Sequence, residues 1–380
     1  MISKDRRKIL VFRLGHLGDT LIALPALHVI RTTFPHAKIS LLSNLYPSPE
    51  RIAPDQVLPK GLIDDWIRYE SSDTGGGLVE MGRLFFVLRR KKFDTLVYLA
   101  PRIRSTSDIR RDLFFFRAAG ITDVIGHLGF ESLPTQVDGR LPEVLQEADH
   151  LLNRLSVSGI PVPESGKGKI NVAVTESEQR QADAWLSQRV TRDGFRQLVA
   201  VGPGSKWPSK VWPEHRFVEI GHRLISVGLL PVVFGGAEDR QLGTRLISSW
   251  GSGINAAGEL SIRLAAAALL RCQFYVGNDT GTMHLAAAVN TKCVAIMSAL
   301  DWPGHWNPYG NGHVVLRRSV PCEGCLLKTC DAEGMRCLRE ISVHEVWRAC
   351  EKLIAPAFSE SAYPGDTSAR QCVASQESCN

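Results

Sequence analysis

Three short segments carry residue types that could bind an anionic group or move a proton. The first, residues 12–20 (FRLGHLGDT), places Asp19 behind two glycines, where a predicted strand gives way to a helix. Asp19 or Thr20 can cap that helix, or Asp19 can face a cleft as a general base. The helix N-terminus favours an ionised carboxylate in either case. The residues leave both roles open.

The second segment, residues 201–213 (VGPGSKWPSKVWP), is a basic, glycine-containing loop that follows a predicted strand. Glycines allow backbone N–H groups to turn toward a ligand, and a lysine supplies a point charge for phosphate. The GK[ST] sequence of a P-loop is absent. Ser205, Lys206 and Lys210 are therefore phosphate-binding candidates, with a basic surface loop braced by tryptophans as the alternative.

The third segment, residues 277–288 (GNDTGTMHLAAA), directly follows a predicted strand and opens a helix. Asp279, Thr280 and Gly281 lie where backbone N–H groups have no partner within the helix, and such groups attract anions. His284 comes one turn later and can reach the same point, although alone it is equally a structural histidine. Combined with the basic loop, this helix start predicts a bound diphosphate.

Two further residues extend this predicted site. Glu238 follows another strand in the sequence GGAED, where a carboxylate can accept hydrogen bonds from ribose hydroxyls. Leu260 opens a helix and can cover a base or pack in the core. In the first of these roles each residue would suit a nucleotide, but core packing is the more common role for such a leucine.

All of these segments adjoin predicted strands, so the order of the strands decides whether they can meet. Strands alternate with helices, which indicates an α/β fold with parallel sheets. The predicted strands are residues 8–13, 38–43, 94–100, 197–201, 229–234, 274–277 and 293–297, the last completing its sheet. Residues 45–77 are rich in Pro, Asp, Ser and Gly, which predicts long loops.

A chain of 380 residues is long enough for two domains. The turn-rich residues 159–168 are the best candidate for a linker. We expect two Rossmann-like domains, 1–165 and 166–355, which face each other across a cleft, and a disordered tail at 356–380. Such sheets bind ligands at the carboxyl ends of their strands, so the segments should meet in the cleft.

The overall composition excludes several classes of protein. Hydrophobic residues make up 44% and charged residues 22%, the values of an ordinary globular chain rather than a collagen or a disordered chain. No apolar run approaches the ~20 residues that span a bilayer, and the N-terminus lacks the apolar core of a signal peptide. We therefore expect a cytoplasmic protein.

The net charge of +6 is concentrated in one segment. Residues 83–117 contain ten Lys and Arg against three Asp, an excess at least as large as that of the whole chain. This is either a solvated helix face or a surface that attracts an anionic acceptor or lipid leaflet. Arg102 and Arg104 follow the strand that ends at Ala100, so they are the cations expected to face the cleft. Nucleic acid is disfavoured because the charge is local and no recognition module is present.

Four of the nine cysteines form a compact cluster near the C-terminus. Cys322, Cys325, Cys330 and Cys337 have the spacing C-x2-C-x4-C-x6-C. Such a cluster could hold Zn²⁺ or an iron–sulfur cluster, but only the first pair has the CxxC spacing. Reduced cysteines packed within the protein are the alternative, which suits a cytoplasmic chain.

In combination, the motifs RLGHLGDTLIALPAL, KVWP, FGGAED and NDTGTMHLAAA resemble those of glycosyltransferase family 9, the ADP-heptose:lipopolysaccharide heptosyltransferases. The resemblance runs in order from about residue 8 to residue 353. It implies the GT-B fold, two facing Rossmann-like domains with an interdomain cleft. It also implies that the donor binds the C-terminal half and the acceptor binds the N-terminal half.

The resemblance assigns roles residue by residue. Asp19 matches the proposed catalytic base, Lys210 matches the phosphate-binding lysine and Glu238 matches the ribose contact. Leu260 matches the apolar residue that contacts adenine. The donor motif is matched by Asp279, Thr280, Gly281 and His284. Upstream of Lys210 the chain departs from the family, because Ser205 and Lys206 replace the paired threonines of some members. The expected acceptor-binding residues are Arg13, Arg102 and Arg104.

The activity implied by the resemblance is inverting transfer of heptose from ADP-heptose to a lipopolysaccharide inner-core acceptor of the Kdo–lipid A type. The implied partners are an ADP-sugar and an anionic glycolipid, with peripheral contact with the inner membrane and no cofactor. We expect metal independence because a lysine cradle can hold the departing diphosphate. Two alternatives stay open: a family member that uses another nucleotide sugar for a different surface glycan, and a non-catalytic protein that binds nucleotide sugars.

Overall fold

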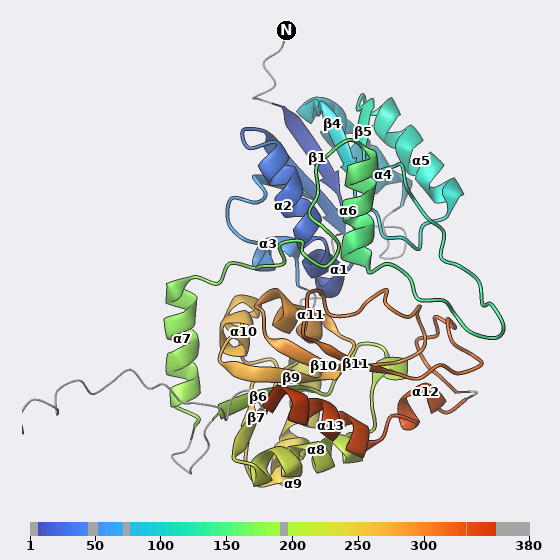
Figure 1. Cartoon of the computed structure of the whole chain (residues 1–380). Coiled ribbons are helices and arrows are strands. Elements are labelled where there is room, and N and C mark those ends of the chain that lie inside the picture. Colours follow the sequence, from blue (N-terminus) through green and yellow to red (C-terminus); the bar gives the residue numbers. More distant parts are fainter. Residues whose placement is uncertain (1–6, 45–51, 71–76, 191–196, 332, 355–380) are drawn as a thin grey trace, which may run out of the picture.

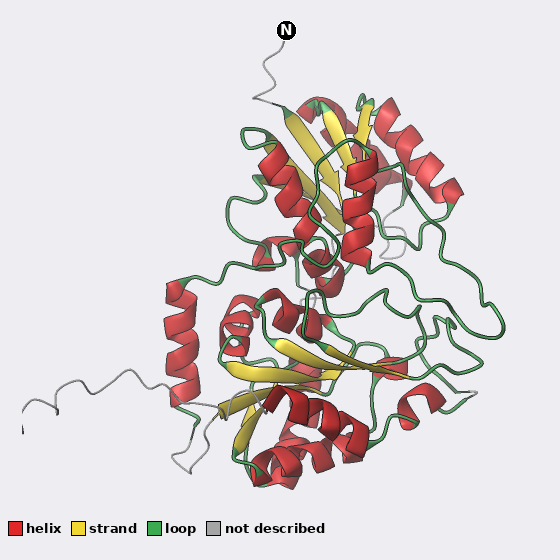
Figure 2. Ribbon diagram, viewed as in Figure 1, coloured by secondary structure: helices red, strands yellow, loops and turns green. Residues whose placement is uncertain are grey.

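The computed structural model describes residues 7–44, 52–70, 77–190, 197–331 and 333–354. The predicted tail, 356–380, lies outside these described residues, as does part of the predicted loop region. Two parallel sheets form two domains, drawn one above the other in Figures 1 and 2. The first sheet has the strand order β3-β2-β1-β4-β5 and the second has β11-β10-β9-β6-β7-β8. The expected α/β fold class is confirmed.

The N-terminal sheet is covered by helices on both faces. Its strands are β1 (Lys8–Phe12), β2 (Lys38–Asn44), β3 (Asp65–Tyr69), β4 (Thr95–Tyr98) and β5 (Asp123–Ile125), all paired in parallel. The helices are α1 (Leu17–Ile22), α2 (Leu24–Thr33), α3 (Pro54–Val57), α4 (Leu78–Lys91), α5 (Thr106–Ala118) and α6 (Glu147–Val157). The central strands β1 and β4 are almost wholly apolar because both of their faces are buried.

Alternate residues of these strands pack against different helices. Leu10 and Phe12 of β1 share a core cluster with α4 and α5, whereas Ile9 and Val11 share another with α2 and α6. The helices α4 and α5 therefore cover one face of the sheet, and α2 and α6 cover the other. This separation leaves the outer sides of α4 and α5 at the protein surface.

The C-terminal sheet comprises β6 (Gln197–Gly202), β7 (Leu229–Val233), β8 (Ile254–Asn255), β9 (Cys272–Asn278), β10 (Lys292–Met297) and β11 (Val314–Arg317). Its helices are α7 (Glu176–Ser187), α8 (Glu214–Ser226), α9 (Arg240–Trp250), α10 (Ile262–Leu269), α11 (Gly281–Ala288), α12 (Arg336–Arg339) and α13 (Val343–Ile354), with short 3₁₀ turns at Pro208–Lys210 and Ala237–Asp239. Buried Trp212 and Phe217 lie in the core cluster on one face, where α8 packs against α13. The helices α10 and α11 pack on the other.

Four strands were missing from the sequence prediction. The strand β3 lies within residues 45–77, which we predicted as loops, and β11 follows β10, which we predicted as the last strand; β5 and β8 were not predicted either. All four are edge strands that pair with one neighbour. An edge strand is only partly buried, so polar residues such as Asp65 and Arg68 interrupt the apolar run that marks a central strand.

The two domains touch where α1 meets α11. A Cβ atom on Gly18 would lie 3.0 Å from Cδ2 of His284, and one on Gly281 would lie 2.9 Å from Cδ2 of Leu17. Glycine at these two positions therefore lets the two helices approach each other. The long loop that follows β5 also reaches from the upper domain to the lower one (Figure 1). Both contacts lie at the carboxyl ends of the strands.

Candidate active site

One cavity of about 550 Å³ lies between the domains and is lined by both. The residues predicted from the sequence that line it are Asp19, Arg102, Ser205, Lys206, Lys210, Glu238, Leu260, Asp279, Thr280, Gly281 and His284. The structure therefore brings together the proposed base and every predicted donor-binding residue. Of the three arginines expected at the acceptor, Arg102 reaches the cavity wall.

The Asp19 carboxylate takes part in the cap of α1 and also lines the cavity. It lies in the first turn of α1, where Oδ2 accepts a hydrogen bond of 2.9 Å from the backbone N–H of His16. The residue also lines the cavity and keeps 21% of its side chain exposed. Gly15 has a φ of +133°, and a Cβ atom there would lie 2.2 Å from Cγ of Asp19. The glycine thus makes room for the carboxylate.

On the C-terminal side of the cavity, Lys210 and Asp279 form a nearly buried ion pair, with 2.6 Å between Nζ and Oδ2. Burial alone would lower the pKa of Lys210, but the charge and hydrogen bond of Asp279 outweigh it and raise the pKa. The lysine is therefore a fixed positive charge in the cavity wall. Asn278 holds its loop in place, because its side chain donates to the carbonyl of Pro203 at 2.6 Å and accepts from the N–H of Trp212 at 3.1 Å.

The start of α11 points unpaired backbone donors at the same place. Thr280 is the N-cap residue, so the N–H groups of Gly281 and Thr282 are in the first turn and have no acceptor within the helix. His284 is 3% exposed, and its Nε2 lies 3.9 Å from Oδ1 of Asp279. Burial lowers the pKa of His284, so the neutral ring is the stable form at neutral pH. This end of the cavity suits an anionic group.

The opposite end of the C-terminal side of the cavity is more apolar. Leu260 packs against the core cluster and lines the cavity together with Phe234 and Ile262. Glu238 is exposed at the cavity rim, where its carboxylate can accept hydrogen bonds from hydroxyl groups. Its neighbour Asp239, which our sequence analysis missed, also lines the cavity, and burial raises the pKa of Asp239 to about 6.

The three arginines expected to bind the acceptor occupy different positions. The Arg102 side chain is 4% exposed, its Nε donates to the carbonyl of Glu131 at 3.0 Å, and its Nη1 has no partner among the described residues. Arg104 instead pairs with Asp112 at 2.9 Å and lies over the ring of Phe12, outside the cavity lining. The acidic residue on the adjacent helix therefore holds Arg104 away from the predicted site.

Arg13 is also absent from the cavity lining, but it supports Asp19 from behind. Its Nε donates to the backbone carbonyl of Asp19 at 3.2 Å, and its Nη2 lies 3.5 Å from the Asp19 carboxylate. Its Nη1 contacts the fully buried carboxylate of Glu147 at 3.1 Å. We therefore describe Arg13 as a positioning residue rather than as a contact of the acceptor.

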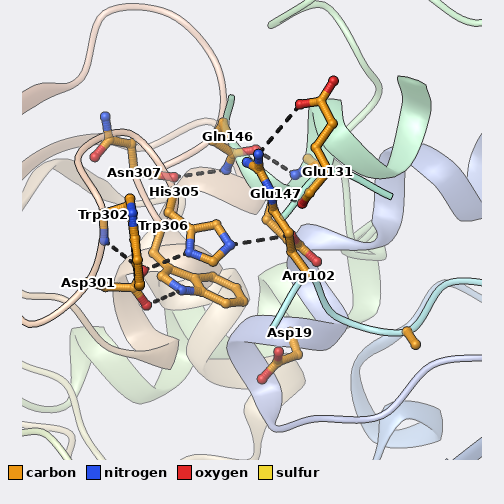
Figure 3. Close-up of polar contacts among 12 residues, drawn as sticks. Asp19, Arg102, Glu131, Gln146, Glu147, Asp301, Trp302, His305, Trp306 and Asn307 are labelled. Atoms are coloured by element: carbon orange, nitrogen blue, oxygen red, sulfur yellow. Dashed lines mark hydrogen bonds and ion pairs between the residues drawn. The ribbon is translucent and has the colours of Figure 1, made fainter. Parts of the chain in front are cut away.

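Glu147 begins a chain of buried charges that crosses between the domains (Figure 3). Its second oxygen lies 3.4 Å from Nε2 of His305, and Nδ1 of His305 lies 2.7 Å from the carboxylate of Asp301. Trp306 donates its indole N–H to the same Asp301 carboxylate at 2.9 Å. Asp301, His305 and Trp306 belong to the C-terminal domain and line the cavity. The chain thus ties the Asp19 side of the cleft to the donor side.

Each member of this chain keeps its charge through its neighbours. Burial would raise the pKa of Glu147, but His305 and Arg13 lower it to about 2. Burial would lower the pKa of His305, but Asp301 and Glu147 raise it to about 9. Both groups are therefore charged at neutral pH. Our sequence analysis missed this chain, and the only local signal was the four-residue spacing of Asp301 and His305.

The cysteine cluster lies outside this site. Cys322, Cys325, Cys330 and Cys337 line a second, small cavity beside Ser209. Burial and the neighbouring thiols raise the pKa of Cys322 and of Cys337. Across the described ranges, no group of three or more His, Cys, Asp or Glu is arranged to hold a metal ion, and these four cysteines are free thiols. The four thiols therefore lie around one small cavity, apart from the interdomain cavity.

Two parallel α/β domains with a cavity at their strand ends are the architecture of the GT-B fold. The family model described as "Glycosyltransferase family 9 (heptosyltransferase)" matches residues 143–336, just over half of the chain. The chain belongs to glycosyltransferase family 9. This family is the one that the sequence motifs indicated.

Among curated relatives, the chain is 34% identical over 107 residues to lipopolysaccharide heptosyltransferase 2 of Salmonella typhimurium. That match covers 27% of this chain and 31% of the relative, so the chain spans about a third of the curated relative's length. Over 131 residues it is 32% identical to lipopolysaccharide heptosyltransferase 1 of Pseudomonas aeruginosa, covering 33% of this chain and 36% of that protein.

Solved structures agree with the fold over nearly the whole chain. A glycosyl transferase family 9 structure from Veillonella parvula has a TM-score of 0.69 and 22% identity, covering 93% of this chain and 99% of that one. The structure of E. coli ADP-heptose lps heptosyltransferase II has a TM-score of 0.63 and 21% identity, covering 92% and 99%. These likenesses confirm the expected GT-B fold.

In the described parts of the chain, no helix is both long and apolar enough to span a membrane.

Proposed function

We propose that this chain is an inverting glycosyltransferase that moves heptose from ADP-heptose to an inner-core lipopolysaccharide acceptor of the Kdo–lipid A type. The observation that carries the proposal is the convergence of Asp19 and all predicted donor-binding residues on one interdomain cavity. Membership of family 9 supports the reaction class, and the names of the matched relatives support heptose as the sugar.

The C-terminal side of the cavity suits ADP. Lys210 and the first N–H groups of α11 would hold the diphosphate, because they supply positive charge without a mobile ion. Glu238 would accept hydrogen bonds from the ribose hydroxyls, and Leu260 would lie against the adenine base. We propose that this cradle stabilises the departing ADP without a metal. If EDTA abolished transfer and Mg²⁺ restored it, this part of the proposal would be wrong.

The N-terminal side suits the acceptor and the proton transfer. Asp19 would remove the proton from the acceptor hydroxyl, whose oxygen then forms a bond to the anomeric carbon of the sugar. The bond from that carbon to the ADP oxygen breaks on the opposite face, and ADP leaves with the electron pair. Arg102, with its buried and unpaired Nη1, would bind an anionic group of the acceptor.

The decisive experiment incubates the chain with ADP-heptose, UDP-sugars or GDP-sugars together with defined Kdo–lipid A acceptors, followed by mass spectrometry. We expect one heptose to be added from ADP-heptose. Transfer from a different nucleotide sugar would replace the proposed donor with the first alternative. Binding of ADP without turnover of any donor would favour a non-catalytic nucleotide-sugar-binding protein.

We further propose that the reaction takes place in the cytoplasm at the inner membrane.

A further inference from the structure

The outer sides of α4 and α5 expose aromatic residues where a soluble helix would normally show polar ones. Phe86 of α4 is 72% exposed and Phe114 of α5 is 74% exposed. In the first turn of α4, Leu78 and Val79 are 92% and 88% exposed. Exposed apolar residues are ordinary when scattered singly, but grouped ones mark an interaction site.

These residues belong to one surface because the two helices are neighbours. The rings of Phe85 on α4 and Phe115 on α5 lie 6.1 Å apart, and Arg89 of α4 donates to the carbonyl of Ala118 at 2.9 Å. Both helices bury their inner sides in the same core cluster on the sheet. Phe86 and Phe114 therefore point away from the same face of the sheet. We call this surface the α4–α5 face; its members are Leu78, Val79, Phe86, Arg90, Arg110, Phe114 and Arg117.

Unpaired arginines flank each exposed phenylalanine. Arg90 lies four residues after Phe86, while Arg110 and Arg117 lie four before and three after Phe114, spacings that put side chains on one side of a helix. All three arginines are exposed and have no ion-pair partner in the portion of the chain that the structure describes. Several other cations of this segment are paired, for example Arg83 with Glu80 and Arg111 with Asp108. Three arginines without an ion pair among the described residues thus lie beside the exposed aromatic rings.

We propose that the α4–α5 face docks on an anionic lipid bilayer. Aromatic and aliphatic side chains gain free energy by entering the boundary between headgroups and acyl chains, while arginines beside them bind lipid phosphates. A second copy of the chain fits this face less well, because a twofold contact would bring the same unpaired arginines together. The combination of free positive charge and exposed rings therefore selects a bilayer as the partner.

The α4–α5 face continues to the mouth of the cavity. Ile103 lines the cavity, is 63% exposed and lies three residues before the start of α5. Docking through this face would hold the cavity mouth beside the bilayer, where a lipid-linked acceptor is anchored. This consequence rests on the proposed function, whereas the docking itself rests only on the surface.

The first test measures co-sedimentation of the full chain with vesicles of phosphatidylglycerol and phosphatidylcholine, and with phosphatidylcholine alone. We expect binding to the anionic vesicles that weakens with added salt. At ~1 kcal/mol per cation, Arg110→Gln with Arg117→Gln should weaken partitioning about 30-fold. The matched control, Arg180→Gln with Arg348→Gln, removes the same charge from exposed positions on the C-terminal domain and should bind like the original chain. If both double variants lost the same amount of vesicle binding, the effect would be one of net charge alone, and the proposal would be overturned.

The second test removes the aromatic component. Phe86→Ser with Phe114→Ser should weaken vesicle binding at least 10-fold, including at high salt, because each ring loses its burial in the membrane. The control Val227→Ser with Leu327→Ser changes exposed apolar residues of the C-terminal domain and should leave binding unchanged. Unchanged vesicle binding of the phenylalanine variant would overturn the proposal. So would the finding that the original chain is a dimer and the phenylalanine variant is a monomer. Neither test needs a sugar donor or an acceptor, so both tests can be interpreted even if the proposed transferase activity is not found. ADP binding is measured separately and reports on the cavity.

Discussion

The two sides of the cleft are built in different ways. On the proposed donor side, Lys210, Glu238 and Asp279 each follow a strand of the C-terminal sheet within a short, recognisable motif. On the proposed acceptor side, Asp19 contacts Arg13, which in turn contacts Glu147, a glutamate more than a hundred residues away in the sequence. The first side is assembled mainly from local geometry, whereas the second is assembled from long-range buried charge.

This difference has a physical cause. A diphosphate can be held by helix N–H groups and one lysine, and a strand-end loop presents these wherever it folds. A general base must instead be held at a defined position against another domain, which requires contacts that cross the fold. The buried chain through His305 provides such contacts. Variants on each side should therefore fail in different ways.

The largest effect is expected for Asp19→Asn. Loss of the base should lower kcat by about 10²–10⁴-fold, because the amide cannot accept the proton from the acceptor hydroxyl. The affinity for ADP, measured by calorimetry, should remain unchanged because the donor contacts lie on the other side of the cavity. Full transfer activity in this variant would remove Asp19 as the base and undo the comparison.

A large effect on stability is expected for Glu147→Gln. The variant leaves Arg13 and His305 without their shared buried counter-charge, so the free energy of unfolding should fall by about 3 kcal/mol or more. Urea unfolding measures this loss. The control Glu80→Gln breaks an exposed pair with Arg83 and should change little. Equal stability of both variants would mean that the buried chain does not join the domains.

On the donor side, Lys210→Met should weaken ADP binding by about 10–100-fold, because a charged hydrogen-bond donor to the diphosphate is lost. The loss should appear in the dissociation constant measured by calorimetry. Lys206→Gln provides the control, since this lysine is exposed in the same loop and should matter less. A greater loss for Lys206→Gln would assign the phosphate contact to the other lysine.

The smallest effect concerns pH and His305. Its pKa is about 9 in the folded chain and near 6.5 when unfolded, so the stabilisation by the charged ring is complete below pH 6.5 and is lost as the pH rises through 9. The difference in Tm between the original chain and His305→Gln should shrink by a few degrees over this range. The control His222→Gln changes an exposed histidine and should show no such trend. A Tm difference independent of pH would show that His305 acts by packing alone.

Prediction from sequence succeeded where a feature is local. The central strands and the start of α11 were predicted within a few residues, because apolar runs and strand-end glycines act over short distances. The edge strands β3, β5, β8 and β11 were missed because they are short or only partly buried, so none of them shows a long apolar run. Arg104 was expected in the cleft from its position after a strand, but Asp112 on the next helix turns it away.

The sequence by itself determined the two-sheet α/β fold, the family and which strand-end residues line the C-terminal side of the cavity, because these depend on periodicity and on short motifs at strand ends. Only the tertiary structure decided which arginine reaches the cavity and which carboxylate and histidine link Asp19 to the other domain. The same holds for the exposed rings of the α4–α5 face. The physical reason is that burial, pairing and exposure are set by neighbours in space, and no local pattern records those neighbours.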